Sequence, residues 1–561
     1  MSNVHPARSG GQILVDALKI HGVELAFCVP GESYLAVLDA FYDAKDIRLI
    51  SCRHEGGAAN MAEAHGKLTG RPGICFVTRG PGAANAAIGV HTAFQDSTPM
   101  ILFVGQAARG QLEREAFQEV DFRRMFAPLA KWAAQIDDAR RIPELVSQAF
   151  HRAVSGRPGP VVLALPEDML TECVETDDTL PYQAAEAHPG PEAMARLRAM
   201  LATAKRPFVI AGGGGWTADA IAGLRAFAET FNLPVGASFR CQDLYDNTLP
   251  NYAGDVGIGI NPALARRVKE SDLLLVVGAR LGEMTTGGYT LVRVPNPEQT
   301  LIHVHAGAEE LGRVYRAALP INAGMAAFTT AAKDLQPIKP GPWAEWTAAA
   351  RADYLANIAP QPGPGRLQMA EIVTWLSRRL PADAILTNGA GNYTGWLHRY
   401  YQYRRWRTQL APTSGAMGYG VPAAIAAKAA HPERIVVCFA GDGCFLMTGQ
   451  ELATAVQYGL NIVVVVVNNG MYGTIRMHQE REYPGRTIAT ELANPDFAAL
   501  ARAYGAQGET VETTADFAPA FERALVAGRP ALIELKLAPE AITTRTTLAD
   551  IRMAALKAKQ G

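Results

Sequence analysis

The sequence has no excess of charge of either sign. Its 53 Lys and Arg residues nearly equal its 54 Asp and Glu residues, which leaves a formal net charge of −1. A protein with this balance has no net positive charge that would attract nucleic acid or an anionic membrane. We therefore expect neither as a partner and look for a small-molecule substrate instead.

Long apolar runs and paired cysteines are missing as well. No stretch of 18 apolar residues occurs, and Met1 to Gly10 lacks the apolar segment of a signal peptide. The seven cysteines are an odd number, contain no CxxC pair and stand mostly inside apolar runs. This usage is typical of a reducing compartment and argues against a zinc site. These absences predict a soluble, cytoplasmic protein.

What the sequence has is length and repeated α/β patterning. With 561 residues, 48% of them hydrophobic, the chain is long enough for about three domains. The first and the last stretch share a strand, a glycine turn, a helix and a strand. We predict an α/β protein with three doubly wound parallel-sheet domains over residues 8–175, 190–336 and 366–540, followed by a helical, solvated tail over 541–561. Linkers are expected at 189–191, 337–342 and 360–365.

The most informative stretch runs from Ile435 to Gly473. A buried strand ends in the turn Gly441-Asp442-Gly443, a helical pattern follows, and a second buried strand ends at Asn468-Asn469. Asp442 and Asn469 should therefore lie at the carboxyl ends of parallel strands, where ligands collect in open α/β sheets. Their oxygens suit Mg²⁺, and the amides of a glycine turn suit a phosphate. The alternative is a structural turn with a helix-capping aspartate.

A second candidate stands in the first domain. Glu55 follows a predicted strand directly, within Arg53-His54-Glu55-Gly56-Gly57, and its flanking glycines would let a flat ring approach. A carboxyl group in such a cleft could hold a proton for a heterocycle nitrogen. The alternative is an ordinary acid at a helix start, favoured by the helix macrodipole.

Several motifs together resemble the acetolactate synthase-like thiamin diphosphate enzymes. In chain order they are Arg53-His54-Glu55, Thr78-Arg79-Gly80-Pro81-Gly82, Ala116-Phe117-Gln118-Glu119, Met417-Gly418-Tyr419-Gly420-Val421-Pro422 and the unit from Asp442 to Asn469. The last of these matches the family signature, Gly-Asp-Gly followed by Asn-Asn. The resemblance implies a pyrimidine-binding domain, a central domain and a diphosphate-binding domain, in that order.

The resemblance also implies roles for single residues. Glu55 would hydrogen-bond the aminopyrimidine ring and so promote the C2 ylid that adds to a carbonyl group. Mg²⁺ would be held by Asp442, Asn469 and the carbonyl oxygen of Met471. The implied cofactor-binding residues are Gly391, Asn392, Met417, Gly441, Asp442, Gly443, Cys444, Asn469, Met471, Tyr472 and Gly473.

Partners and a second cofactor are implied less directly. Family members pair the pyrimidine-binding domain of one subunit with the diphosphate-binding domain of another, which implies a homodimer or a dimer of dimers with shared active sites. Some members bind FAD in the central domain and others leave that domain empty. Here the glycines Gly212 to Gly215 do not form a G-x-G-x-x-G motif, so FAD remains possible without being indicated.

Departures from true acetolactate synthases concern the second substrate. His478 stands where those enzymes carry a tryptophan, and Met284 where they carry an arginine, whose loss removes planar carboxylate recognition. A further departure is Glu32-Ser33-Tyr34, which stands where a small residue is usual. For His478, a surface position without a catalytic role is the simpler interpretation. The candidate substrate contacts are Glu32, Ser33, Phe117, Gln118, Lys131 and His478.

The predicted function is a thiamin diphosphate- and Mg²⁺-dependent lyase or carboligase that acts on small 2-oxo acids or aldehydes. The alternative is a 2-oxo acid decarboxylase, or a C–C hydrolase or lyase of the same superfamily, that makes no acetolactate. A lyase of CoA esters is disfavoured because no basic cluster suited to a nucleotide phosphate stands out. A binding protein with a dead site is disfavoured because Glu55, Asp442 and Asn469 are all present.

Overall fold

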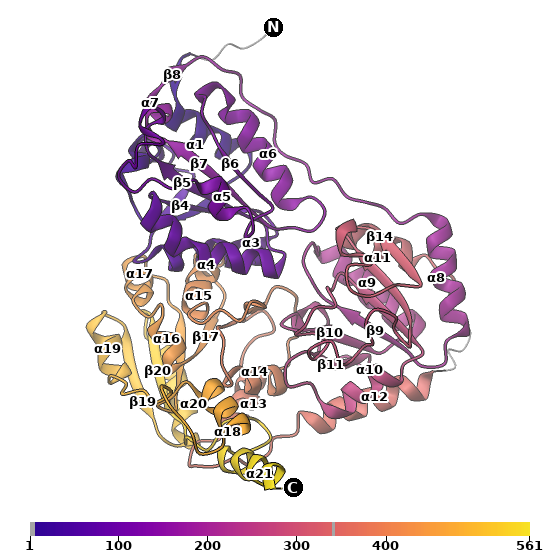
Figure 1. The fold of residues 1–561 in the computed structure, drawn as a ribbon. Coiled ribbons are helices and arrows are strands. Elements are labelled where there is room, and N and C mark those ends of the chain that lie inside the picture. The colour runs from indigo at the N-terminus through magenta and orange to yellow at the C-terminus, as the bar shows by residue number, and fades with distance from the viewer. Residues whose placement is uncertain (1–5, 339–342, 561) are drawn as a thin grey trace. The chain divides into compact units, whose positions relative to one another are not determined.

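Three parallel β-sheets of six strands each, with helices around them, make up the protein (Figure 1). The computed structural model describes residues 6–338 and 343–560. The first sheet belongs to one compact unit, and the central and third sheets belong to a second unit that begins at Glu186. The predicted α/β fold with three parallel-sheet domains is confirmed. Among the residues described, no helix is both long enough and apolar enough to cross a membrane.

The first sheet has the strand order β3-β2-β4-β5-β7-β6. Its strands are β2 (Leu25–Cys28), β3 (Arg48–Ser51), β4 (Gly73–Val77), β5 (Met100–Gln106), β6 (Trp132–Gln135) and β7 (Pro160–Pro166). Its helices are α1 (Gly10–Ile20), α2 (Leu35–Asp43), α3 (Glu55–Thr69), α4 (Gly80–Asp96), α5 (Phe122–Phe126), α6 (Ile142–Val154) and α7 (Glu167–Thr171). Small residues bring α3 and α4 together, since a Cβ on Gly89 would lie 2.4 Å from the Cβ of Ala59. A short antiparallel pair, β1 (Arg8–Ser9) with β8 (Cys173–Val174), joins the two ends of this region.

The central sheet has a different order, β11-β10-β9-β12-β13-β14. Its strands are β9 (Pro207–Ala211), β10 (Val235–Ser238), β11 (Tyr252–Val256), β12 (Leu273–Val277), β13 (Thr300–His305) and β14 (Leu319–Asn322). Its helices are α8 (Pro191–Thr203), α9 (Ala218–Phe231), α10 (Pro262–Glu270), α11 (Met325–Lys333) and α12 (Ala344–Asn357). The last helix lies beyond the predicted end of this domain, and part of the linker predicted at 337–342 lies outside the described residues. Helix α12 packs here because Trp346 donates its indole N–H to the oxygen of Pro207 at 3.0 Å.

The third sheet repeats the order of the first, β16-β15-β17-β18-β20-β19, as the shared sequence pattern predicted. Its strands are β15 (Ile385–Asn388), β16 (Gln409–Leu410), β17 (Val436–Gly441), β18 (Val463–Asn468), β19 (Gln507–Val511) and β20 (Ala531–Lys536). Its helices are α13 (Met369–Arg379), α14 (Thr394–Tyr400), α15 (Gly420–Ala430), α16 (Asp442–Leu446), α17 (Glu451–Gln457), α18 (Gly473–Glu482), α19 (Phe497–Ala503), α20 (Thr514–Leu525) and α21 (Leu548–Gln560).

Two local predictions about this last domain are wrong. The single helix expected after Gly443 is divided into α16 and α17 around Gly449, where a Cβ would lie 2.7 Å from the Phe445 ring. The tail is helical, as expected, but its helix α21 is docked and not simply solvated. Arg552 of α21 forms an ion pair with the fully buried carboxylate of Glu480 on α18. A buried acid of this kind needs its partner, which is why the tail stays in place.

Candidate active site

The carboxyl ends of β15, β17 and β18 lie side by side, because these strands pair in parallel. Asn392 follows β15, Asp442 follows β17, and Asn469 follows β18. The loop after β15 is tied to the first turn of α18 by the hydroxyl of Thr474, which donates to the side-chain oxygen of Asn392 at 2.9 Å. Three candidates that lie far apart in the sequence thus share one edge of the sheet.

Asp442 lies in the middle of these three strand ends, because β17 pairs with both β15 and β18. It is the first residue of α16 and is only 3% exposed. Its Oδ1 accepts the Gly443 N–H at 2.9 Å, and its Oδ2 accepts the Gly470 N–H at 2.9 Å. Burial raises the pKa of Asp442, and these hydrogen bonds oppose that shift. The helix-capping alternative does not hold, since Gly441 occupies the N-cap and no side chain caps the helix.

Asn494 is a member of this site that the sequence analysis missed. Its Nδ2 donates to Asp442 Oδ2 at 2.8 Å and to Asn468 Oδ1 at 2.9 Å. Its own Oδ1 is buried and accepts no hydrogen bond. A buried acceptor without a partner is costly, and beside a carboxylate it provides a place for a cation or a cation-bound water. Its only sequence signal was Asn-Pro before a helix, which is typical of an ordinary turn.

The two asparagines of the Asn-Asn pair have different surroundings. Asn468 is engaged inside the protein, because its Nδ2 donates at 2.6 Å to the buried carboxylate of Glu534, which Lys536 also contacts at 2.6 Å. Asn469 is half-buried and follows the strand end, close to Gly473, where a Cβ would lie 3.2 Å from its amide nitrogen. Asn469 is therefore the member of the pair that remains for a ligand.

The other predicted cofactor residues surround this edge. A Cβ on Gly443 would lie 2.6 Å from the Tyr472 ring, so only glycine fits there. The Cys444 sulfur accepts the Gly418 N–H at 3.2 Å and the Tyr393 hydroxyl at 3.4 Å, so the side chain faces the protein. The remaining members lie on the loops that adjoin these contacts: Gly391 after β15, Met417 half-buried before Gly418, and Gly441, Met471 and Gly473 next to the strand ends.

The donor set fits Mg²⁺ better than a softer metal. The predicted ligands are the carboxylate of Asp442, the side-chain oxygen of Asn469 and the carbonyl of Met471, and phosphate and water would complete such a set. Within the described part of the chain, no three His, Cys, Asp or Glu side chains come together as a metal cluster. Zinc and other metals that prefer thiolate or imidazole ligands therefore have no site of that kind there.

Glu55 lies in the other compact unit, as the first residue of α3. Its Oε2 accepts a hydrogen bond from Asn85 of α4 at 2.9 Å. Its Oε1 lies 3.6 Å from where a Cβ of Gly82 would stand, so the glycine turn at the start of α4 leaves space beside it. His54 caps α3 by accepting the Gly56 N–H at 3.0 Å. A capping role is therefore taken by His54, and the Glu55 carboxylate points to α4.

The candidate substrate contacts differ in accessibility. Phe117 is 69% exposed on the loop between β5 and α5, with Gln118 beside it, and Glu32 is exposed. Ser33 is fully buried, with its hydroxyl 3.0 Å from that of Thr78.

Lys131 and His478 complete this set. Lys131 donates to the carbonyl oxygens of Arg152 at 2.5 Å and Ser155 at 2.8 Å, which ties it to the end of α6. His478 is exposed on α18. Ser33 and Lys131 thus have structural contacts, whereas Phe117, Gln118 and His478 remain open to a ligand.

Comparison with known proteins identifies the family. Three family models match: "Thiamine pyrophosphate enzyme, N-terminal TPP binding domain" over residues 8–125, the central domain over 194–332 and the C-terminal TPP binding domain over 389–535. The acetolactate synthase large subunit of Corynebacterium glutamicum is 31% identical over 95% of this chain and 87% of its own length. The chain belongs to the thiamin diphosphate-dependent enzymes. The acetolactate synthase isozyme 2 large subunit of Escherichia coli is 30% identical over 94% of this chain and 95% of its own length. The acetolactate synthase large subunit of Lactococcus lactis is 33% identical over 89% of this chain and 87% of its own length.

The central domain of this thiamin diphosphate enzyme has its own glycine loops. The strand order reverses between β9 and β12, where a dinucleotide would bind in such a fold. There a Cβ on Gly278 would lie 2.5 Å from the Gly212 oxygen. Trp216, only 5% exposed, donates its indole N–H to that same oxygen at 2.9 Å. The two loops and the indole are therefore in direct contact at this reversal.

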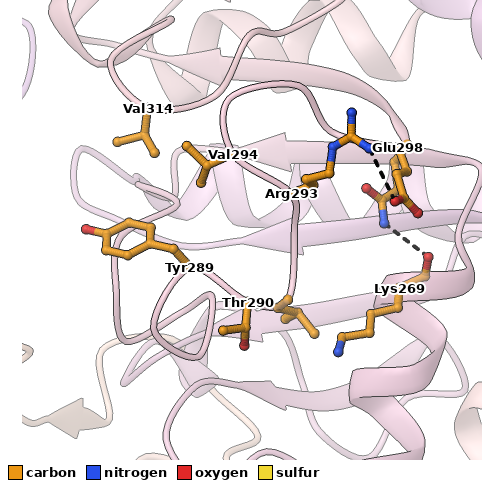
Figure 2. Close-up of a pocket in the computed structure, with 9 residues that line it drawn as sticks. Lys269, Tyr289, Thr290, Arg293, Val294, Glu298 and Val314 are labelled. Atoms are coloured by element: carbon orange, nitrogen blue, oxygen red, sulfur yellow. Dashed lines mark hydrogen bonds and ion pairs between the residues drawn. The ribbon is translucent and has the colours of Figure 1, made fainter.

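A pocket of about 830 Å³ lies elsewhere in the central domain (Figure 2). It is lined by Lys269, Tyr289, Thr290, Leu291, Arg293, Val294, Glu298, Gln299 and Val314. Lys269 lies in the last turn of α10 and Gln299 precedes β13, so the pocket lies toward the amino ends of the strands. It is thus separate from the edge at which a dinucleotide would bind, and it contains none of the predicted site residues.

Proposed function

We propose that the protein is a Mg²⁺-dependent lyase or carboligase that uses thiamin diphosphate to act on small 2-oxo acids or aldehydes, in the manner of an acetolactate synthase. The observation that carries the proposal is the Asp442 carboxylate, oriented by Gly443, Gly470 and Asn494 beside the unpartnered Asn494 oxygen. The family and the names of the relatives support the same class of reaction.

In this proposal some residues bind the metal and others hold a proton of the cofactor. When bound, thiamin diphosphate supplies a carbon nucleophile and an electron sink for breaking or forming a C–C bond. Asp442, Asn469 and the Met471 carbonyl hold Mg²⁺ and through it the diphosphate group. Glu55, kept in place by Asn85, holds a proton at a nitrogen of the pyrimidine ring.

We propose that the working enzyme is a homodimer or a dimer of dimers with shared active sites. In it, Glu55 of one copy would serve the cofactor held by Asp442 of the other copy, as the resemblance to the family implies. The test is to mix Glu55→Gln protein with Asp442→Ala protein after subunit exchange. After random exchange of equal amounts, about half of the dimers are mixed, and each mixed dimer has one intact site and one site that lacks both residues. We therefore expect about a quarter of wild-type activity from two inactive variants. No recovery after verified exchange would contradict shared sites.

We further propose that the enzyme works without FAD and in the cytoplasm. The Trp216 indole, which is bonded to the Gly212 oxygen at the central reversal, supports the first point, because a dinucleotide needs an open crevice there. The cysteines support the second, since all seven are outside disulfides. Flavin absorbance in the purified protein would contradict the first point.

The activity is tested directly with purified protein, thiamin diphosphate, Mg²⁺ and pyruvate, alone and with other 2-oxo acids or aldehydes. Carbon dioxide and condensed products are measured together, with Glu55→Gln and Asp442→Ala as controls. Acetolactate that disappears in both variants supports the leading proposal. Carbon dioxide without a condensed product favours the decarboxylase alternative, which Met284 and His478 make relevant. Turnover that is unchanged in Glu55→Gln would refute the mechanism.

A further inference from the structure

The loop that carries Phe117 and Gln118 is held in an unusual backbone conformation. It connects β5 to α5, and three of its non-glycine residues have left-handed φ angles: Glu113 at 63°, Glu115 at 54° and Gln118 at 61°. Such residues are strained and persist only where their surroundings hold them. The loop must therefore have fixed anchors, and the structure provides two of them.

The inner anchor is Arg79, which lies just before α4 and is 7% exposed. Its Nη1 donates to the Phe117 carbonyl oxygen at 3.1 Å, while its Nη2 forms an ion pair with Glu167 of α7. The next residue, Gly80, donates its N–H to the Gln118 carbonyl oxygen at 3.0 Å. Two consecutive residues at the start of α4 thus hold two consecutive carbonyls of the loop.

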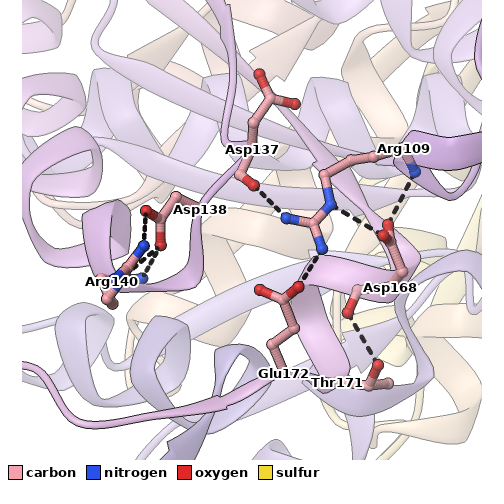
Figure 3. A network of polar contacts seen from close by, with 7 residues as sticks. All are labelled: Arg109, Asp137, Asp138, Arg140, Asp168, Thr171 and Glu172. Carbon is pink, nitrogen blue, oxygen red and sulfur yellow. Dashed lines mark hydrogen bonds and ion pairs between the residues drawn. The ribbon is translucent and has the colours of Figure 1, made fainter.

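The outer anchor is Arg109, at the beginning of the same loop (Figure 3). Its Nε donates to Asp168 at 2.9 Å, and its guanidinium also pairs with Glu172. Glu167 and Asp168 are neighbours on α7, so one short acidic helix holds the arginines of both anchors. Between the anchors, the Glu119 carboxylate accepts the N–H groups of Glu113 at 2.8 Å and Ala116 at 2.9 Å.

The start of α4 also adjoins Glu55. Asn85 of α4 hydrogen-bonds the Glu55 carboxylate at 2.9 Å, and Arg79 precedes the same helix. The helix start therefore connects the proposed cofactor-activating acid with the loop that presents the exposed Phe117 ring. A change in Arg79 alters only the second of these connections, because it makes no contact with Glu55 among its hydrogen bonds to Phe117 and Glu167.

We propose that Arg79, held by Glu167, is a positioning residue that selects the acceptor substrate by fixing the backbone of Phe117 and Gln118. The inference rests on the proposed function, and it assigns a role to a residue whose hydrogen bonds go to the loop and to α7. A guanidinium holds the carbonyl and the carboxylate with two separate nitrogens in a fixed planar fork. A lysine keeps the charge but has a single nitrogen on a shorter side chain, so it does not reproduce the geometry of this fork.

The test compares Arg79→Met and Arg79→Lys with the matched control Arg140→Met. Arg140 pairs with Asp138 on the surface of the same region and does not touch the loop (Figure 3). For Arg79→Met we expect the acceptor KM to rise about tenfold and the preference between two acceptors to change, with Arg79→Lys intermediate. Cofactor affinity and hydrogen exchange at the cofactor's C2 position should stay at the wild-type value, because Glu55 is intact.

A second measurement guards against simple unfolding of the Arg79 variants. Glu167→Gln keeps the bond from Arg79 to Phe117 but weakens its support, so we expect a rise in acceptor KM of about threefold. Amide hydrogen exchange of residues 111–121 should become faster in Arg79→Met and stay unchanged in Arg140→Met.

Three results would overturn the inference. The first is Arg79 variants that match Arg140→Met in acceptor KM, and the second is Arg79 variants that lose cofactor affinity as well. The third is a wild-type enzyme whose turnover does not depend on an acceptor, which leaves the lyase function standing. Absence of any turnover dependent on thiamin diphosphate in the wild type would instead refute the proposed function.

Discussion

The strand order reverses in the central sheet between β9 and β12, and in the third sheet between β15 and β17. Both reversals open toward the carboxyl ends of parallel strands, and glycine loops adjoin both. At the central reversal the Trp216 indole donates to the Gly212 oxygen, whereas the other reversal is bordered by Asp442 and by the unpartnered oxygen of Asn494. Topology thus provides a place for a ligand in both sheets, but the side chains decide whether the place stays open.

The two edges also differ in how their polar groups are satisfied. At the central reversal the Gly212 carbonyl receives the indole N–H, while Asp255 on β11, at the edge of the same sheet, keeps a buried carboxylate oxygen without a partner. At the third sheet the buried carboxylate receives several N–H donors, yet an acceptor beside it has none. A buried polar network that is only partly satisfied is unfavourable by itself, so it indicates a ligand that completes it.

Replacing Asp442 should have the largest effect on this contrast. Asp442→Ala removes the carboxylate and with it the acceptor of the Gly443 N–H, and it leaves Gly470 and Asn494 with only the Asn468 oxygen as acceptor. We expect the affinity for Mg²⁺ and thiamin diphosphate to fall at least about 100-fold, measured by calorimetric titration. Asp255→Asn is the matched control in the central sheet, where burial raises the pKa of Asp255 to about 8. An equal loss of affinity for Mg²⁺ and thiamin diphosphate in both variants would contradict the difference between the central and the third sheet.

Trp216→Ala should open the central reversal. The loss of a buried tryptophan of this size lowers the free energy of unfolding by about 3–5 kcal/mol, which thermal unfolding would detect. Cofactor affinity per folded protein should remain that of the wild type, because the third sheet is untouched. A variant that binds thiamin diphosphate less tightly while folded would show that the two edges are coupled.

Asn494→Ala should weaken metal binding through the carboxylate it orients. Its Nδ2 joins Asp442 to Asn468, so its removal lets the carboxylate rotate. We expect the Mg²⁺ affinity to fall about 10–100-fold. Asn251→Ala serves as the control, since this buried asparagine of the central domain bonds the carbonyls of Ala228 and Leu233. The control should lose stability and keep its metal affinity; the opposite pattern would contradict the role of Asn494.

The pH dependence of Asp442 should be the smallest effect. Because burial raises its pKa in the folded protein, protons compete with Mg²⁺ at a higher pH than for an ordinary aspartate, and the metal affinity falls as the pH is lowered. In the metal-free protein the sign reverses. The folded state then binds more protons than the unfolded state, so the free energy of unfolding rises as the pH falls through the raised pKa. Asp442→Asn should abolish both trends in pH-dependent titration and thermal unfolding.

Local patterns predicted the strands well. The strand predicted before Glu55 is present as β3 (Arg48–Ser51), and the run ending at Asn468 forms β18. Continuous burial of short apolar runs is a local property, and a glycine turn needs no distant partner to be recognised. The break between α16 and α17 was missed because it depends on the Phe445 ring, which closes over Gly449 only in the folded helix.

The sequence by itself determined the parallel-sheet plan, the positions of Glu55, Asp442 and Asn469 at strand or helix ends, and the family. Three contacts became visible only in the folded protein: Asn494 bonds Asp442 across 52 positions of the chain, Trp216 bonds the Gly212 oxygen, and Arg79 bonds the Phe117 carbonyl. The physical reason is that burial patterns and turn chemistry are encoded by neighbouring residues. Which polar atom finds a partner, and which is left for a ligand, depends on residues that meet only on folding.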